Sequence, residues 1–154
     1  MPSPQIIDGP TGLANLAGTE LGVSDWHLID QSLIDSFASV SRDHQWIHVD
    51  VPRASHGPFG ATLAHGLLVL SLLPALAAEV YQVEGTGSRL NYGYDAIRFV
   101  SPVKCGARIR DRVTLRSVEN SGPNVKAITH HVVEIEDSER PACVADSITI
   151  IMPV

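Results

Sequence analysis

The stretch "SRDHQWIHVD", residues 41–50, gathers two aspartates and two histidines within ten positions. Asp43 and His48 are five residues apart, so a turn between them would bring both side chains to one point. A carboxylate and an imidazole placed in this way can hold a water molecule, with one group accepting a proton and the other delivering one. Histidine suits this work because its charge changes near neutral pH. The residue types alone leave an alternative open, in which Asp43 caps a turn and His48 is a buried structural histidine.

The same stretch also has the spacing of a zinc site. His44 and His48 match the helical zinc-protease motif, but Gln45 stands where that motif has its glutamate and cannot act as the general base. β-Branched residues alternate with His48, and Pro52 follows, which indicates an extended or irregular segment in which the two histidines do not share a face. No third ligand is obvious. We therefore expect neither a metal nor a cofactor here.

A second stretch, "FGATLAHG", residues 59–66, comes just before a long apolar segment. The first N–H groups of a helix have no partner within the helix and lie at the positive end of its dipole. Such N–H groups can bind an oxygen that gains negative charge during a reaction. Gly66 could serve in this way, or it could only permit close packing of the helix. We expect His65 to be a structural histidine beside this turn, and His44 and His56 to be solvent-facing.

The elements that position these residues follow from the spacing of apolar side chains. Residues 30–40 predict an amphipathic helix with Asp30 or Ser32 as its N-cap. Residues 41–60 predict an ordered, functional loop, since loops of this length are otherwise uncommon. Residues 62–80 are broken by polar side chains and lack flanking anchors, so they predict a helix buried inside the fold and not a membrane span.

The second half of the sequence predicts strands. Four alternating segments cover residues 89–100, 107–120, 125–137 and 142–152, and residues 121–124 predict a hairpin turn. Residues 22–29 predict a short strand, and residues 1–20 an irregular or lightly helical lead-in. His130 and His131 fall on alternate faces of one strand and suggest no site. The order of elements predicts an α+β fold in which an antiparallel sheet wraps around one apolar helix.

The composition restricts the class of protein. The chain of 154 residues is long enough for a single domain, and its 44% hydrophobic and 18% charged residues are typical of a globular protein. A net charge of −6 argues against a nucleic-acid partner. The N-terminal residues do not resemble a signal peptide, so we expect a cytoplasmic protein in which Cys105 and Cys143 are reduced. A group of basic residues is interpreted as a solvated strand face, with contact to an anion as the alternative: Arg98, Lys104, Arg108, Arg110 and Arg112.

Taken together, "DHQWIHVD", Ala54, "FGATLAHG" and "RFVSPVKCG" resemble the MaoC-like dehydratase family, specifically its single-domain R-specific enoyl-CoA hydratases. The resemblance extends from about Val23 to Ile150. It implies that residues 1–154 form one hotdog domain, in which a long antiparallel sheet wraps around a central helix. It also implies side-by-side dimerisation of two copies.

Carried over residue by residue, the resemblance implies that Asp43 and His48 are the catalytic dyad and that the Gly66 N–H polarises a thioester carbonyl. Gln45 occupies the position of a supporting amide, usually asparagine. The sequence departs from the family at two neighbouring positions. A glycine usually precedes the aspartate, where this chain has Arg42, and a proline usually follows the amide, where this chain has Trp46.

The activity implied is the reversible hydration of trans-2-enoyl-CoA to (R)-3-hydroxyacyl-CoA. The CoA thioester is the substrate and no cofactor is required. Trp46, Phe59 and Leu67 are candidates for contact with the acyl chain. Two alternatives remain, a hotdog acyl-CoA thioesterase and a non-catalytic acyl-CoA-binding subunit whose dyad is spoiled by Arg42 and Trp46. Which member of the dyad acts as the base is left open.

Overall fold

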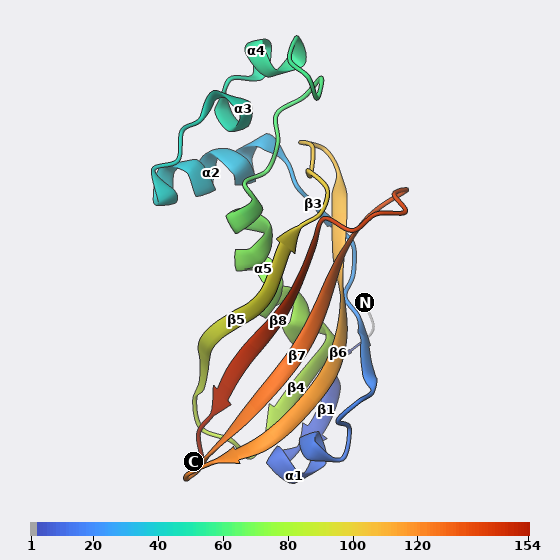
Figure 1. The fold of residues 1–154 in the computed structure, drawn as a ribbon, viewed down its shortest axis with the longest axis vertical. Helices are drawn as coiled ribbons and strands as arrows, with labels where there is room; N and C mark the ends of the chain where they lie inside the picture. Colours follow the sequence, from blue (N-terminus) through green and yellow to red (C-terminus); the bar gives the residue numbers. More distant parts are fainter. Residues whose placement is uncertain (1–2) are drawn as a thin grey trace.

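The computed structural model describes residues 3–154, and a six-stranded antiparallel sheet is its main element (Figure 1). Along the sheet the strands run in the order β2-β6-β7-β8-β5, and β3 also pairs with β6. Their bounds are β2 (Glu20–Val23), β3 (His27–Leu28), β5 (Arg89–Phe99), β6 (Arg108–Ser121), β7 (Asn124–Ile135) and β8 (Cys143–Ile151). The four long strands predicted from alternation are therefore confirmed, as is the turn between β6 and β7.

Alternation works as a signal here because one face of the sheet is buried and the other is not. Along β7, buried and partly exposed residues alternate from Ala127 to Val133, as expected for side chains that point to opposite faces. The outer face of β6 and β7 carries ion pairs. Arg108 pairs with Glu136, while Arg110 and Arg112 both pair with Glu134. The interpretation of the basic group as a strand face is therefore confirmed for Arg108, Arg110 and Arg112 on β6.

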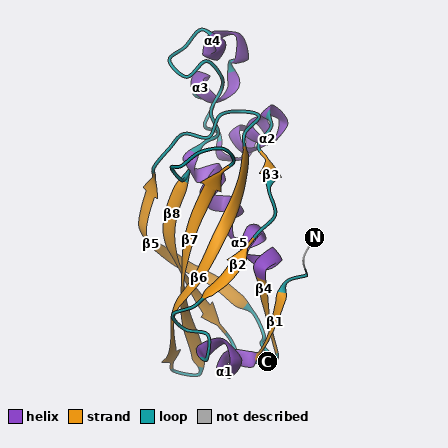
Figure 2. Cartoon of the chain, turned by 90° about the vertical axis from the view of Figure 1, so that its right-hand side faces the viewer, coloured by secondary structure: helices purple, strands orange, loops and turns teal. Residues whose placement is uncertain are grey.

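The central helix is α5 (Gly66–Val80), which lies along the concave side of the sheet (Figures 1 and 2). Leu68, Val69 and Leu73 are buried against the strands and form the middle of the main core. The helix begins four residues later than the start of the predicted segment. The opposite face is open in the single chain, where Leu67 is 61% exposed. The prediction of a helix buried on every face is therefore wrong for one side of α5.

The segment that carries the dyad residues stands above one end of the sheet (Figure 1). Helix α2 (Gln31–Ser41) begins at Asp30, whose side chain accepts a hydrogen bond from the Leu33 N–H, so the predicted cap is confirmed. The predicted extended loop is wrong in part, because it contains two short helices, α3 (Trp46–Val49) and α4 (Val51–Ser55). The Asp50 side chain caps α4, with Pro52 in its first turn.

The lead-in is more regular than the sequence predicts. Strand β1 (Gln5–Asp8) pairs in parallel with β4 (Tyr81–Glu84), and a short helix, α1 (Gly9–Ala14), follows it. These elements close the far end of the sheet over a second core cluster that includes Leu13 and Leu115. Within residues 3–154, no helix combines the length and the apolar character needed to cross a membrane.

Candidate active site

Asp43 comes directly after α2, and the backbone of Arg42 turns the chain there. Arg42 has a φ of 61° and a ψ of 19°, the left-handed conformation that commonly ends a helix. Glycine adopts this conformation without steric cost, whereas a residue with a Cβ pays for it. The fold therefore tolerates Arg42 at some cost in stability and still makes the turn. Beyond it, Asp43 Oδ1 accepts a hydrogen bond from the Gln45 N–H at 3.3 Å, while the Asp43 side chain stays exposed.

His48 lies in α3 and is held by a backbone carbonyl. Its Nδ1 is 2.7 Å from the Leu63 oxygen, and the side chain is buried. A carbonyl oxygen can only accept, so Nδ1 must carry the hydrogen. In the neutral ring, Nε2 then has its lone pair free. The Leu63 carbonyl thus selects the tautomer in which His48 presents a proton acceptor away from the backbone.

Backbone and side-chain hydrogen bonds fix the position of α3. The Gln31 side chain donates to the His48 carbonyl at 2.8 Å and accepts from the Thr62 hydroxyl. The Leu63 N–H donates to the Ile47 carbonyl at 2.9 Å. Leu63 also forms a β-bridge with Lys104, which ties this segment to the end of the main sheet. The dyad residues are therefore anchored to the sheet although they lie on short helices and turns.

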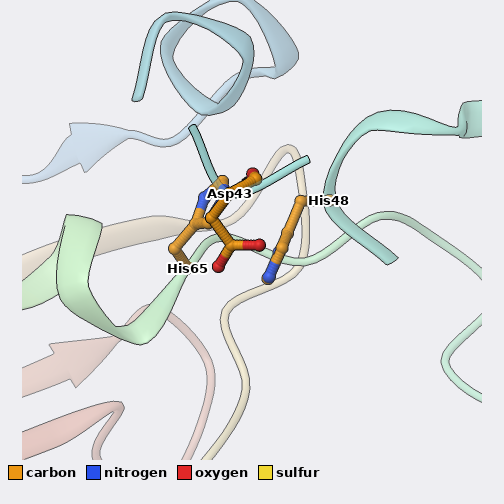
Figure 3. A group of neighbouring side chains, drawn as sticks. All are labelled: Asp43, His48 and His65. Atoms are coloured by element: carbon orange, nitrogen blue, oxygen red, sulfur yellow. The ribbon is translucent and has the colours of Figure 1, made fainter. Parts of the chain in front are cut away.

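His65 is the site residue whose role the sequence does not reveal. Its Nε2 is 3.0 Å from the Asp43 carbonyl oxygen, and its ring stacks on that of His48 with centroids 3.7 Å apart. Figure 3 shows the three side chains converging from separate segments of the chain. We expected His65 to be a structural residue, and its contacts fit that role. These contacts are made to both Asp43 and His48. Its place immediately before Gly66 is the only signal that the sequence offers.

A carboxylate oxygen of Asp43 and ring nitrogens of His48 and His65 all lie within 4.8 Å of one another, a grouping that could hold a metal ion. The zinc motif in the sequence paired His48 with His44, but His44 is not in this group, which Asp43 and His65 complete. The orientation of the rings argues against a metal, however. Imidazole lone pairs lie in the ring plane, and zinc binds ring nitrogens at about 2.0–2.1 Å. Two rings stacked at 3.7 Å with an interplanar angle of 20° cannot both point at one such ion.

Gly66 opens helix α5, so its N–H is among those without an intrahelical partner. A Cβ built on Gly66 would come within 2.9 Å of the Phe99 ring. Only glycine therefore allows this aromatic ring to lie against the start of the helix. Gly66 and Phe99 line a cavity of about 320 Å³, together with Phe59 and Val69. The sequence offered two roles for Gly66, an N–H donor and close packing, and the geometry is compatible with both.

The remaining candidate residues are not all brought together. Phe59 joins the Gly66 cavity. The Gln45 side chain is exposed, and the residue reaches Asp43 through its backbone N–H. Trp46 packs under the Arg53 guanidinium, 4.2 Å from the ring centroid, at the first position of α3. A proline also fits that first position, which explains how either residue can begin α3. Leu67 is exposed on the outer side of α5 and is not among the residues that line the Gly66 cavity.

This arrangement can act on a small molecule in a specific way. A carboxylate and an unprotonated imidazole nitrogen can hold and deprotonate a water molecule. The nearby helix start can stabilise an oxygen that becomes negative. The cavity lined by Phe59, Val69 and Phe99 offers an apolar surface for the rest of the molecule. Such a site suits the addition of water to a carbon activated by a neighbouring carbonyl.

Comparison with known proteins agrees with this chemistry. Residues 13–137 match the family described as MaoC like domain. The chain is 47% identical over 137 residues to 3-hydroxyacyl-thioester dehydratase Z of Mycobacterium tuberculosis, covering 88% of this chain and 91% of the relative. It is also 47% identical over 137 residues to nodulation protein N of Rhizobium leguminosarum bv. viciae, covering 87% and 85%. The R-hydratase PhaJ1 of Pseudomonas aeruginosa shares the fold, with a TM-score of 0.67 at 23% identity over 89% of this chain and 81% of that one.

Proposed function

Because this chain belongs to the MaoC-like dehydratase family, we propose that it hydrates trans-2-enoyl-CoA to (R)-3-hydroxyacyl-CoA and catalyses the reverse dehydration. The chain is an enzyme of the hydratase and dehydratase class, and its relatives support the addition or removal of water at acyl thioesters. The choice of a CoA substrate, the R product and the catalytic residues are our proposal. The hydrogen bond from His48 Nδ1 to Leu63 is the observation that supports the proposal most strongly.

In the proposed reaction, one water molecule lies between the Asp43 carboxylate and His48 Nε2. The water oxygen attacks C3 of the enoyl group while one of its protons passes to the dyad. That proton is then returned to C2, so that the elements of water are added across the double bond and no other reactant is consumed. The bond between His48 Nδ1 and the Leu63 carbonyl supports Nε2 as the acceptor, since it keeps the other nitrogen protonated.

Negative charge develops on the thioester oxygen as water adds at C3. We propose that the Gly66 N–H at the start of α5 donates to this oxygen. The adjoining cavity, lined by Phe59, Val69 and Phe99, would receive the first carbons of the acyl chain. We do not assign Trp46 or Leu67 to the substrate, because one packs on Arg53 and the other faces away from this cavity.

We also propose that two copies of the chain associate through β5. This strand is the last of the main sheet and pairs only with β8, so its other edge has unpaired backbone groups. Leu90 and Tyr92 on β5 are exposed, as is Leu67 on the open side of α5. Pairing of β5 with its copy would satisfy the edge and cover these side chains. Sedimentation analysis should give a dimer, and Tyr92→Lys should shift it towards the monomer.

An assay with crotonyl-CoA separates the proposed function from its alternatives. Loss of the double-bond absorbance without release of free thiol is the expected result, with (R)-3-hydroxybutyryl-CoA as the product. Release of free CoA would instead identify a thioesterase. Tight binding of crotonyl-CoA without turnover would identify a non-catalytic binding subunit. Activity should survive treatment with a chelator, because the proposed mechanism uses no metal. The cytoplasmic location of the protein stays a prediction.

A further inference from the structure

A second cavity lies between α5 and the sheet, further along the helix than the Gly66 cavity. Its volume is about 230 Å³. The side formed by α5 is apolar, with Leu73, Pro74, Ala77 and Ala78. The side formed by the strands is polar, and its residues are Arg89, Asn91, Tyr94, His131, Ser147 and Thr149. Binding pockets of soluble proteins commonly combine an apolar lining with a few polar groups that set specificity.

The polar wall is held by a buried chain of hydrogen bonds. His131 Nδ1 is 2.7 Å from Asp111 Oδ2, and His131 Nε2 is 2.9 Å from the Ser147 hydroxyl. Asp111 is fully buried and His131 is 3% exposed, so this relay is part of the protein interior. The carboxylate fixes the hydrogen on Nδ1, and Nε2 then accepts the hydroxyl proton of Ser147. The lone pairs of Ser147 Oγ remain to accept a hydrogen bond from a molecule in the cavity.

The order carboxylate, imidazole, hydroxyl is also that of a hydrolytic triad, but the surroundings of Ser147 do not fit hydrolysis. Ser147 lies in the middle of β8, paired with Tyr94 of β5 on one side and Thr129 of β7 on the other. The backbone N–H groups around it are therefore committed to the sheet. A triad needs free N–H groups beside its nucleophile to stabilise an oxyanion. The relay is better suited to binding than to catalysis.

Both cavities lie between α5 and β5. Gly66 and Val69 on the helix face Phe99 on the strand at the first cavity, while Leu73 and Tyr94 flank the second. The helix rise places Leu73 about 10 Å beyond Gly66 and Ala77 roughly 16 Å beyond it. An extended chain advances about 1.2 Å per bond, so an acyl group of roughly nine carbons reaches Leu73 and one of roughly fourteen reaches Ala77.

We propose that the second cavity binds the distal end of the acyl chain and selects chains with a hydroxyl group there. This inference rests on the proposed function, because it assumes that the thioester carbonyl lies at Gly66. A hydroxyl both donates and accepts, so it can donate to Ser147 Oγ and accept from Asn91 or Tyr94. A plain alkyl end would displace water from these groups and leave their remaining hydrogen-bonding capacity unused, beyond the bonds of Ser147 to His131 and of Asn91 to Tyr94. The helix side of the cavity packs against the methylene groups in either case.

The test compares trans-2-enoyl-CoAs of roughly nine to fourteen carbons that end in either a methyl or a hydroxyl group. The wild-type enzyme should show a kcat/KM at least about tenfold higher for the hydroxylated chain, the effect of one buried hydrogen bond. Equal values, or a preference for the methyl end, would overturn the proposal. Binding of the saturated acyl-CoAs, measured by calorimetry, should show the same preference without any turnover.

Variants locate the preference within the cavity. Ser147→Ala should reduce the preference for the hydroxylated chain about tenfold, because it removes the acceptor of one buried hydrogen bond. Thr149→Val tests the same wall with a change of similar volume. Ser117→Ala on β6, outside the cavity, is the matched control and should keep the wild-type preference. A preference that persists in both cavity variants would overturn the assignment.

Crotonyl-CoA distinguishes this failure from failure of the proposed function. If crotonyl-CoA is hydrated but the two long chains are treated alike, the cavity proposal is wrong and the proposed function stands. If crotonyl-CoA is not hydrated, the proposed function is wrong, and calorimetry with the saturated chains still decides whether the cavity prefers a hydroxyl group.

Discussion

Two of the carboxylate and imidazole pairs in the molecule, Asp43 with His48 and Asp111 with His131, differ in how the imidazole is held. In the Asp43 and His48 pair, a backbone carbonyl accepts a hydrogen bond from Nδ1 of the histidine, and the carboxylate is exposed. In the Asp111 and His131 pair, the carboxylate itself accepts the hydrogen bond from Nδ1, and this carboxylate is fully buried. The first pair therefore leaves both functional groups free to meet a small molecule. The second uses Asp111 Oδ2 and both His131 nitrogens on each other and on Ser147, while Asp111 Oδ1 has no hydrogen-bond partner among the described residues.

This difference shows why residue types alone do not identify a catalytic pair. The buried pair is joined by a direct hydrogen bond, yet it lies in the sheet, where His131 and its partner Ser147 line the second cavity. Burial raises the pKa of the Asp111 carboxyl, and the hydrogen bond from His131 only partly offsets this. The open pair depends on neighbours such as His65 and Leu63 to hold its geometry. The predictions below contrast the two pairs.

The largest effects should follow changes in the open pair. Asp43→Asn and His48→Gln should each lower kcat for crotonyl-CoA hydration by about 10³-fold or more, as expected for the loss of a general acid or base. Circular dichroism and thermal unfolding should show a folded protein in both cases. His44→Gln is the matched control, because His44 is exposed and outside the Asp43, His48 and His65 cluster. A similar loss in His44→Gln would show that the assay reports damage to the segment as a whole.

Gly66→Ala keeps the backbone N–H but should displace it, and it should therefore lower kcat by up to about 10²-fold, the usual cost of losing one donor to a developing oxyanion. The added methyl group would press on the Phe99 ring and displace the start of α5. Adding Phe99→Ala to Gly66→Ala removes the clash and should restore part of the rate. Full activity in the single variant would contradict a role for this close contact in placing the N–H.

Changes in the buried pair should act on stability and not on crotonyl-CoA turnover. Asp111→Ala should lower the free energy of unfolding by about 3 kcal/mol, because it leaves His131 buried without its partner. Asp111→Asn keeps an acceptor for His131 Nδ1 and should cost about 1 kcal/mol. Urea unfolding gives both values, and kcat for crotonyl-CoA should stay within about threefold of the wild type. A large loss of turnover in a folded Asp111→Asn enzyme would place this pair in the catalytic machinery.

Because the pKa of Asp111 is raised in the folded protein, the difference in stability between the wild type and Asp111→Asn should depend on pH. The folded protein binds a proton on Asp111 at higher pH than the unfolded chain does, whose aspartates titrate near about 3.9. The stability contributed by this group is therefore complete below that value and is lost as the pH rises through the folded pKa. Relative to Asp111→Asn, the wild type should lose stability as the pH rises above about 4. Urea titrations across this range measure the difference, and a difference that grows in favour of the wild type would contradict it.

The smallest expected effect concerns the turn before Asp43. Arg42→Gly should raise the free energy of unfolding by up to about 1 kcal/mol, because glycine relieves the strain of the left-handed conformation, an effect that the entropy gained by the unfolded chain offsets only in part. Arg42→Ala is the control, since it removes the side chain but keeps the strain. Equal stability of the two variants would show that the backbone at this position is not strained.

Much of the fold could be predicted from the sequence because its signals are local. The long strands alternate over enough residues to reveal their buried face, and Asp30 marks the start of α2 with a cap. Helices α3 and α4 have four and five residues, too few for a helical period to emerge. Strand β1 gains its order from pairing with β4, about seventy positions away, which no local pattern records.

The grouping of the candidate site residues could be predicted in part for the same reason. Asp43 and His48 lie close in sequence, and Gly66 follows a recognisable turn, so the resemblance to a family could connect them. His65 depends on a stacking contact with His48 that only the fold creates. The Asp111, His131 and Ser147 relay joins three different strands. Alternation predicted that His130 and His131 point to opposite faces, but it did not show what His131 meets on the inner face.

The most direct test of the central claim, that Asp43 and His48 act together on one water molecule, is a double-mutant cycle. It compares kcat for crotonyl-CoA hydration in Asp43→Asn, in His48→Gln and in the variant that carries both changes. Residues that work as a unit are strongly non-additive, so the double variant should be no slower than the slower single variant. Losses that multiply would indicate two independent roles, and near wild-type rates in the single variants would contradict the claim altogether.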